Sequence, residues 1–295
     1  MLRRVATLDQ ESAPCGTPWS YQRALAGATL EVNPGEESAL EKTPRLFRMG
    51  SSVHITMLPG GTLSDSLPVV HGLLRAGYKP VPHVAARGVE SLVELSRFLR
   101  SVEKAGGESV FLIAGDRLRS QGPFSSSIEV LKTGVLEGEG ISQVGIAGYP
   151  EGHPLIDDAE IEHALIEKLN GIRQRDMKPW IVSQFCFDAA AIATWLSNLS
   201  AQGVDCPVRV GLAGPTEIKT LLRFARLCGI GASIRAIRSH GRRLGKLARY
   251  GGPEAMLREL VAGLTPDHQR LFDGIHVYPF GGLAASSAWL HGVED

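Results

Sequence analysis

The chain has 295 residues, and its 31 Lys and Arg residues balance 31 Asp and Glu residues, so the formal net charge at pH 7 is zero. Proteins that bind nucleic acid by neutralising phosphates normally carry a basic surplus or a clustered basic face. No basic run here is longer than two residues, as in the pair Arg242 and Arg243. A composition of 43% hydrophobic and 21% charged residues is typical of a folded globular chain. We therefore expect a sizeable core and no nucleic-acid partner.

The sequence also argues against a membrane segment, a leader peptide and a metal site. No stretch approaches the roughly 18 to 20 uninterrupted apolar residues of a membrane-spanning helix. Asp9, Glu11 and Pro14 fall where a signal peptide would place its apolar segment. The cysteines form no C-x-x-C pair, which favours reduced, buried thiols: Cys15, Cys186, Cys206 and Cys228. We expect a cytoplasmic protein with no membrane association and no metal.

Short apolar or β-branched runs recur along the chain and alternate with amphipathic segments. The runs span 28–32, 52–57, 80–84, 109–114, 143–147, 180–184, 208–212 and 274–278. Apolar residues at i, i+3 and i+4 predict helices over 64–76, 90–105, 126–133, 158–169, 188–201 and 217–227. Near-continuous apolar strands indicate burial on both faces, which a parallel sheet covered by helices provides. Eight such units predict an α/β fold, the (β/α)8 TIM barrel.

The same pattern sets the domain organisation. Residues 1–20 read as an irregular N-terminal extension, and 21–295 as a single barrel domain. The interval between the seventh and eighth runs is long enough for extra helices at about 229–265. Neither the G-x-G-x-x-G fingerprint of a dinucleotide-binding sheet nor a G-x-x-x-x-G-K-[ST] phosphate loop occurs, and both absences favour the barrel.

Polar residues at the carboxyl ends of the runs are the candidates for chemistry, because the active sites of such barrels form at that face. They are Glu31, Thr56, His83, Asp116, Tyr149, Glu151, His153, Gln184 and Tyr278. Each of them, taken singly, also has a purely structural interpretation.

Glu31 stands out because an acid within Ala-Thr-Leu-Glu-Val must leave water on folding. Desolvation raises the pKa of a carboxyl group, as a general acid near neutral pH requires. Asp116 follows Gly115 at a strand end, where the backbone can turn a carboxylate toward the barrel mouth, able to accept hydrogen bonds from an amidine-like pair of N–H groups. Two prolines stiffen the segment 149–154, which would hold its aromatic and imidazole groups in place.

Several motifs occur in a specific order. Residues 147–154 read AGYPEGHP and residues 183–188 read SQFCFD; shorter segments are LEVNP (30–34), VHIT (53–56), PHV (82–84) and GDR (115–117). In this order they resemble the methylenetetrahydrofolate reductase family, whose motifs are A-[AG]-Y-P-E-x-H-P, T-Q-x-x-F-D, F-E-F-x-P-P, V-x-V-T, P-H-L and R-G-D. The matches extend over most of the chain.

The resemblance implies a catalytic barrel that binds FAD, reduces it with NADH or NADPH, and passes hydride to the methylene group of 5,10-methylenetetrahydrofolate. It makes Glu31 the general acid, Asp116 the partner of the pterin ring, and Gln184 a folate contact. Tyr278 matches a substrate-side position of the eighth strand. The positions that match the family's cofactor-binding residues are Thr56, His83, Gly115, Tyr149, His153 and Lys168.

The sequence also departs from the family pattern. Ala114 stands where the family has Arg, 122–127 reads GPFSSS in place of a Tyr-Ala pair, and the helix after 154 offers Glu162, Leu165, Lys168 and Leu169 in place of Asp, Asn and a basic pair. Gly282 and Ile218 replace an expected Arg and Phe. Fewer cationic donors would weaken the binding of a diphosphate group. We therefore expect a divergent member with a thinned FAD pocket.

Three alternatives remain open at this stage. The same folate reaction could proceed by direct hydride transfer without flavin, in either direction. The barrel could be a lyase or hydrolase that uses Glu31 and Asp116 on a small anionic substrate, with Gly281 and Gly282 at a phosphate site. The third alternative is a folate-binding homologue without catalytic activity. Glu31 argues against it, because a protein that only binds folate has little use for a desolvated acid. The outer helix surfaces are compatible with a homo-oligomer.

Overall fold

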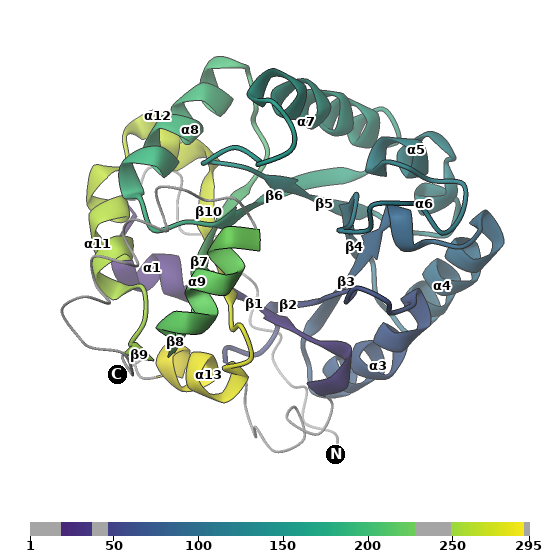
Figure 1. The fold of residues 1–295 in the computed structure, drawn as a ribbon, viewed down its shortest axis with the longest axis horizontal. Coiled ribbons are helices and arrows are strands. Elements are labelled where there is room, and N and C mark those ends of the chain that lie inside the picture. Colours follow the sequence, from purple (N-terminus) through teal and green to yellow (C-terminus); the bar gives the residue numbers. More distant parts are fainter. Residues whose placement is uncertain (1–18, 37–46, 228–248, 292–295) are drawn as a thin grey trace, which may run out of the picture.

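A closed barrel of parallel strands forms the centre of the molecule. In the computed structural model, residues 19–36, 47–227 and 249–291 are described. Within these ranges eight strands close in the order β1-β10-β7-β6-β5-β4-β3-β2, and helices surround them (Figure 1). The strands are β1 (Thr29–Val32), β2 (Ser52–Ile55), β3 (Lys79–Ala85), β4 (Ser109–Ile113), β5 (Gln143–Gly148), β6 (Lys178–Phe185), β7 (Val208–Ala213) and β10 (Phe272–Tyr278). The predicted TIM barrel is confirmed, and each apolar run supplies one strand.

Helices connect the strands and cover the outside of the barrel. They are α3 (Leu67–Arg75), α4 (Leu92–Lys104), α5 (Ser127–Lys132), α6 (Val135–Gly138), α7 (Asp158–Arg173), α8 (Ala189–Ala201), α9 (Ile218–Leu227), α11 (Glu254–Gly263), α12 (Pro266–Leu271) and α13 (Leu283–His291). Three 3-10 turns join them: η1 (Pro34–Glu36), η2 (Leu63–Ser66) and η3 (Ala86–Gly88). Side chains of Ser91, Asp157 and Asp188 accept hydrogen bonds from first-turn amides and fix the starts of α4, α7 and α8.

Two layers of apolar packing hold the barrel together. The larger core lies between strands and helices and includes Leu30, Ile55, Leu99 and Ile146, all fully buried. Inside the barrel, Val81, Phe111 and Val182 form a smaller cluster, against which Trp180 packs. This inner plug fills part of the barrel interior, so polar side chains near the carboxyl ends of the strands are set in an apolar surround.

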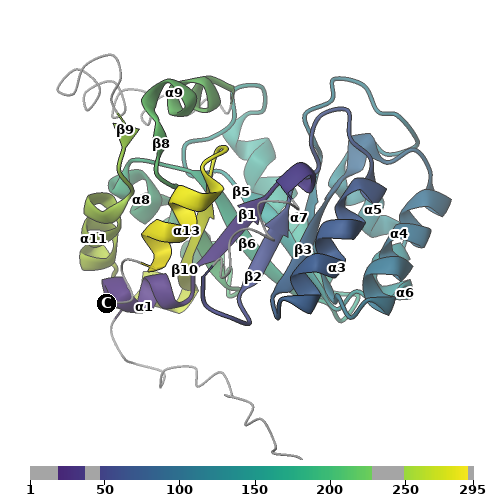
Figure 2. The same cartoon turned by 90° about the horizontal axis from the view of Figure 1, so that it is seen from below.

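Further elements lie beyond the two ends of the barrel. At the carboxyl end, β8 (Thr216–Glu217) pairs with β9 (Arg249–Tyr250), and α9 rises above the strands (Figure 2). At the amino end, α1 (Tyr21–Ala26) packs against β10 through the buried residues Tyr21 and Ala24. The sequence patterns did not predict β8, β9, α1, α6 or α13, which are short or lack a clear period.

The expected insertion before the eighth strand is partly visible. Helices α11 and α12 follow β9 and precede β10. The part of the expected insertion at 228–248 lies outside the described residues, as does 1–18 of the expected N-terminal extension. In the described ranges, none of the helices has the length and apolar character needed to cross a membrane.

Candidate active site

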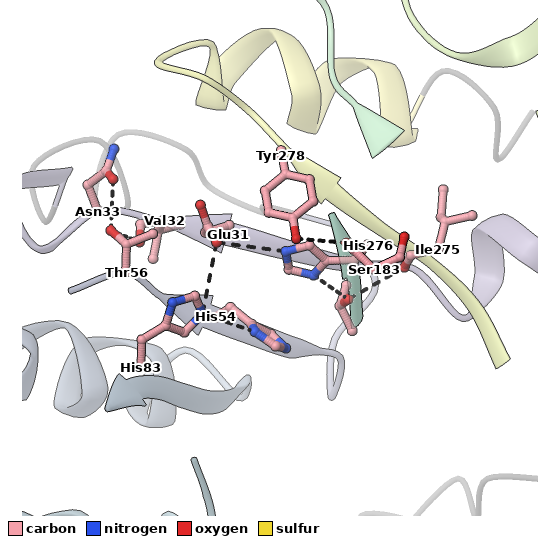
Figure 3. A network of polar contacts seen from close by, with 11 residues as sticks. Glu31, Val32, Asn33, His54, Thr56, His83, Ser183, Ile275, His276 and Tyr278 are labelled. Atoms are coloured by element: carbon pink, nitrogen blue, oxygen red, sulfur yellow. Dashed lines mark hydrogen bonds and ion pairs between the residues drawn. The ribbon is translucent and has the colours of Figure 1, made fainter. Parts of the chain in front are cut away.

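Glu31 lies in the middle of β1, and its side chain turns into the barrel among three histidines (Figure 3). Its Oε2 atom is 3.9 Å from Nε2 of His83 on β3 and 3.9 Å from Nε2 of His276 on β10. Nδ1 of His54, on β2, is 3.3 Å from Nε2 of His83. The site is therefore a carboxyl group between the imidazoles of β3 and β10, with a third imidazole from β2 beside His83.

Burial controls the protonation of this group of side chains. The Glu31 side chain is 19% exposed, whereas those of His83 and His276 are 8% and 1% exposed. Desolvation raises the pKa of Glu31 above its ordinary value, and the nearby His83 opposes that shift without overcoming it. An acid with a raised pKa keeps its proton nearer to neutral pH. Burial therefore favours the protonated form of Glu31.

The three imidazoles are neutral at physiological pH. Desolvation lowers the pKa of His83 to about 4, although Glu31 pulls it upward. Desolvation and the charge of Arg209 lower the pKa of His276 to about 3. Burial also lowers the pKa of His54 well below its ordinary value, helped by the other two histidines and Arg209. Glu31 is therefore surrounded by neutral hydrogen-bonding groups rather than by cations that would favour its ionised form.

Two of these histidines are not among the candidates drawn from the sequence. His54 and His276 lie one alternation before Thr56 and Tyr278, the strand-end residues that were selected. Because side chains at i and i+2 point to the same face of a strand, the inward direction of Thr56 and Tyr278 also implies it for His54 and His276. The period-two alternation of the strands could have identified His54 and His276 as inward-facing residues. Both lie inside apolar runs, whereas the candidates were polar residues at the ends of such runs.

Asp116 lies beyond β4 in a loop that is firmly braced. Gly115 has φ of +86°, and a Cβ atom there would come within 2.9 Å of Ala85 Cβ, so the turn requires glycine. The Arg87 guanidinium donates hydrogen bonds to the carbonyl groups of Gly115, Arg117 and Ser125 at 2.9–3.4 Å. Asp116 itself is exposed. This arrangement holds the loop and leaves the carboxylate open to a ligand.

The rigid segment after β5 brings Tyr149 and His153 together. Their ring centroids are 5.6 Å apart in an edge-to-face arrangement, and Nδ1 of His153 accepts a hydrogen bond from the amide of Leu155. Desolvation lowers the pKa of His153, while the negative charge of Asp116 partly offsets this effect. Glu151 accepts a hydrogen bond from the Cys186 thiol at 3.0 Å. Tyr149, His153 and Asp116 thus belong to one region of the barrel mouth.

Two further candidates, Thr56 and Lys168, lie on different elements. The Thr56 hydroxyl follows β2 and donates a hydrogen bond of 2.9 Å to Oδ1 of Asn33. Lys168 lies on α7, and desolvation lowers its pKa to about 8. Among the described residues, the Lys168 ammonium has no ion-pair partner. An ammonium that is largely desolvated and unpaired would gain from an anionic ligand.

Gln184 on β6 and Tyr278 on β10 come from the two strands that flank β7. The Tyr278 hydroxyl donates a hydrogen bond of 3.0 Å to the carbonyl of Ser183, and Gly211 leaves space for the tyrosine ring. The Nε2 atom of Gln184 is buried and has no hydrogen-bond partner in the described parts of the chain. Since a buried amide donor without an acceptor costs free energy, it is an available contact for a bound molecule.

The candidates therefore form separate groups around one barrel end. Glu31 and His83 share the central network, Asp116, Tyr149 and His153 share the loop region, and Lys168 lies outside both groups. For the described residues, no cluster of three His, Cys, Asp or Glu side chains has an arrangement that fits a metal ion.

Together, these features define a (β/α)8 barrel protein with a desolvated acid at the centre of its strands. The chain belongs to the methylenetetrahydrofolate reductase family, whose model matches residues 32–236. It is 19% identical over 212 residues to methylenetetrahydrofolate reductase 1 of Schizosaccharomyces pombe, an alignment that covers 68% of this chain and 34% of that protein. The chain thus matches about a third of the length of this relative.

A solved structure of similar architecture has low sequence identity to this chain. A protein of Burkholderia cenocepacia, provisionally described as a phosphonomutase, has a TM-score of 0.50 at 10% identity, with 93% of this chain and 96% of that chain covered. Dihydropteroate synthase from Thermus thermophilus has a TM-score of 0.48 at 15% identity, with 90% and 92% covered. The first of these likenesses supports the barrel fold and carries no information on activity.

Proposed function

We propose that this protein is an oxidoreductase that interconverts 5,10-methylenetetrahydrofolate and 5-methyltetrahydrofolate with a nicotinamide cofactor. The observation that carries the proposal is the position and environment of Glu31. In a chain of this family, a desolvated carboxyl group with a raised pKa projects from β1 into the barrel, where a proton donor for the folate is needed.

The chemistry assigned to Glu31 is proton transfer to a folate nitrogen. Protonation of one nitrogen of the five-membered imidazolidine ring allows its bond to the methylene carbon to break, and the remaining nitrogen and carbon form an iminium ion. Hydride addition to that carbon gives the methyl product. Desolvation raises the pKa of Glu31 and so favours its protonated form until the substrate nitrogen takes the proton.

Asp116 and Gln184 are proposed to hold the pterin ring. Asp116 is an exposed carboxylate on a braced loop, so it can accept hydrogen bonds from the amidine-like N–H pair and stabilise positive charge on the ring. Gln184 offers a buried N–H donor that lacks a protein acceptor among the described residues. Tyr278, anchored to the Ser183 carbonyl, borders the same space from β10.

The proposed cofactor is FAD. The residues of this chain offer binding groups for some parts of that molecule. Lys168 is a largely desolvated ammonium that a phosphate group would neutralise. Tyr149 and His153 form a held pair of rings after β5, with Gly115 after β4 and Thr56 after β2 at the same end of the barrel. FAD, when bound, would accept hydride from the nicotinamide and return it to the folate. His83 is engaged within the Glu31 network, so we assign its main role there.

The experiment that tests this function combines a spectrum with two anaerobic assays. The purified protein should show flavin absorbance, or acquire it when FAD is added. Mixing with methylenetetrahydrofolate and NADH or NADPH, or with methyltetrahydrofolate and NAD⁺ or NADP⁺, should change the nicotinamide absorbance. Turnover without flavin would support the proposed reaction and contradict the proposal that FAD is its cofactor. Absence of turnover in both directions, with FAD present, would overturn the proposed function.

A further inference from the structure

The amino-terminal end of the barrel contains a cavity that the proposed function does not use. Its volume is about 470 Å³, and polar side chains at the beginnings of the strands line it, among them Ser52, Ser109, Gln143, Lys178 and Asp273. Lys178 is exposed, as is Asp205 at the rim, so the cavity communicates with solvent. A space of this size exceeds by an order of magnitude the roughly 30 Å³ that one water molecule occupies in the liquid, and its polar side chains offer partners to water.

The inner end of this cavity reaches the network beneath Glu31. Thr29 and His54 both line the cavity, although they are only 2% and 1% exposed. The Thr29 hydroxyl is 2.8 Å from Nδ1 of His276, and Nε2 of His276 is 3.9 Å from the Glu31 carboxyl group. Thr29 and Glu31 are two positions apart on β1 and point to the same side. Thr29 therefore contacts the cavity on one side and the histidine on the other.

We propose that Glu31 regains its proton from solvent at the amino-terminal end of the barrel, through Thr29 and His276. This inference rests on the proposed role of Glu31. A water molecule in the cavity gives a proton to the Thr29 oxygen as the Thr29 hydroxyl proton passes to Nδ1 of His276. The proton on Nε2 of His276 passes to the Glu31 carboxylate at the same time. One proton enters and one reaches Glu31, and solvent neutralises the hydroxide left in the cavity. His276 is left with its proton on Nδ1, and exchange of its ring proton with solvent returns the Nε2–H form before the next turnover.

The path runs through the ring of His276 because each nitrogen of that ring faces a different partner. Thr29 lies at Nδ1 and Glu31 at Nε2, so a proton can enter one side and leave at the other. His83 differs, since the same Nε2 atom faces both His54 and Glu31. A proton that His83 receives from His54 does not cross its ring. For the proton to reach Glu31, Nε2 of His276 and Oε2 of Glu31 must approach each other by about 1 Å, from 3.9 Å to hydrogen-bonding distance.

When folate is bound, a path for protons from the amino-terminal cavity would serve a purpose that the carboxyl end of the barrel cannot. Substrate at the carboxyl end covers the face of Glu31 from which the proton is delivered. The opposite end stays open to solvent, so Glu31 can be reprotonated before the product leaves. The charge of Arg209, held by Asp273 at 2.7 Å, disfavours a full positive charge on His276 and favours a concerted transfer.

The test compares Thr29→Val, which removes the hydroxyl at nearly constant volume, with Thr29→Ser, which retains it. Ser109→Ala is the matched control, because it removes another hydroxyl from the same cavity. We expect Thr29→Val to lower kcat for the folate reaction by about tenfold to a hundredfold with little change in KM, and to raise the solvent deuterium isotope effect. Thr29→Ser should restore both values, and Ser109→Ala should leave them unchanged.

A second measurement does not depend on turnover. Infrared difference spectra of the Glu31 carboxyl group, identified by its loss in Glu31→Gln, report the rate at which its proton exchanges with deuterium. Thr29→Val should slow this exchange relative to the parent and Thr29→Ser. Equal exchange rates would overturn the proton path, even if the parent protein turns over folate. Slow exchange in Thr29→Val, in a protein whose parent form shows no folate turnover, would instead overturn the proposed function and leave the path standing.

Discussion

At the scale of single residues, the site depends on the contrast between one acid and its neutral neighbours. Neither His83 nor His276 gives Glu31 a cationic neighbour at neutral pH, because burial keeps their pKa values at about 4 and about 3. A permanent cation in either position would lower the pKa of Glu31 and remove its proton at neutral pH. The absence of positive charge beside the acid is thus as important as the acid.

The first prediction concerns Glu31→Gln, which retains the shape and removes the transferable proton. Folate turnover should fall by about 10²- to 10⁴-fold, the range of general acid catalysis. If flavin is bound, oxidation of NADH by an artificial electron acceptor should stay near the parent rate, because that half-reaction needs no proton from Glu31. Stopped-flow measurement of both half-reactions checks this. An equal loss in both would contradict the general-acid role.

The second prediction concerns stability in acid. The buried histidines bind protons in the unfolded chain at about pH 6.5 but not in the folded protein until about pH 4 for His83 and about pH 3 for His276. The contribution of the two neutral histidines to the free energy of unfolding is fully present above about pH 6.5, and it is lost as the pH falls toward 4 for His83 and toward 3 for His276. Each histidine contributes a slope of about 1.4 kcal/mol per pH unit in this window. Glu31, with its raised pKa, contributes a slope of opposite sign above about pH 4.5.

His276→Gln should therefore reduce the slope of unfolding free energy against pH between about 6.5 and 3, as measured by urea titrations at several pH values. His71→Gln, at an exposed position of α3, controls for the loss of one imidazole from the chain. Parallel pH profiles for the parent and His276→Gln would show that this buried imidazole is not held neutral by the fold.

At the scale of elements, the barrel interior is filled by side chains that need particular small residues on neighbouring strands. Gly145 on β5 faces Trp180 and Phe111, and a Cβ atom there would lie 2.4 Å and 2.5 Å from their ring atoms. The inner plug can form only because β5 has no side chain at this position. The glycine thus supports the layer directly below the polar network.

The third prediction follows from this contact. Gly145→Ala should destabilise the protein by about 1–3 kcal/mol, because the added methyl group overpacks the plug. Gly72→Ala is the control: Gly72 lies inside α3, its added Cβ would have no neighbour within 4 Å, and alanine favours the helix by about 0.5–1 kcal/mol. Thermal unfolding of both variants gives the comparison. A Gly145→Ala protein as stable as Gly72→Ala would contradict the packing argument.

At the scale of the whole molecule, zero net charge gives no long-range field to attract an anionic cofactor or folate. Binding of an anionic ligand must then come from local groups, and Lys168 is the one proposed for the cofactor. A ligand that binds the folded protein alone stabilises it by about 2.7 kcal/mol at a hundred times its Kd. Ligand-dependent stability is therefore a measure of which molecules this barrel holds.

The fourth prediction uses that linkage. FAD should raise the Tm of the parent protein, and the increase should shrink as pH rises through about 8, because Lys168 loses its charge there. Lys168→Met should abolish most of the FAD-dependent increase and preserve the increase caused by methyltetrahydrofolate. A flavin effect that is equally large in Lys168→Met would remove this residue from the cofactor site.

The sequence by itself determined the barrel and most of its candidate residues. Eight apolar runs separated by amphipathic segments specify buried parallel strands, and Glu31, Asp116 and Gln184 stand out as polar residues at the ends of such runs. These features depend on local periodicity and on short motifs, which a linear sequence records directly. The assignment to the family follows from the same motifs.

Only the tertiary structure decided which residues meet. His54, His83 and His276 are far apart in the chain, and barrel closure between β1 and β10 brings His276 to the same carboxyl group as His83. The unpaired amide of Gln184, the clamp of Arg87 on the Asp116 loop and the cavity behind Thr29 are, within the described residues, likewise products of strand register. Local periodicity determines which way each side chain faces, but its neighbours depend on how the strands are ordered and aligned around the closed barrel.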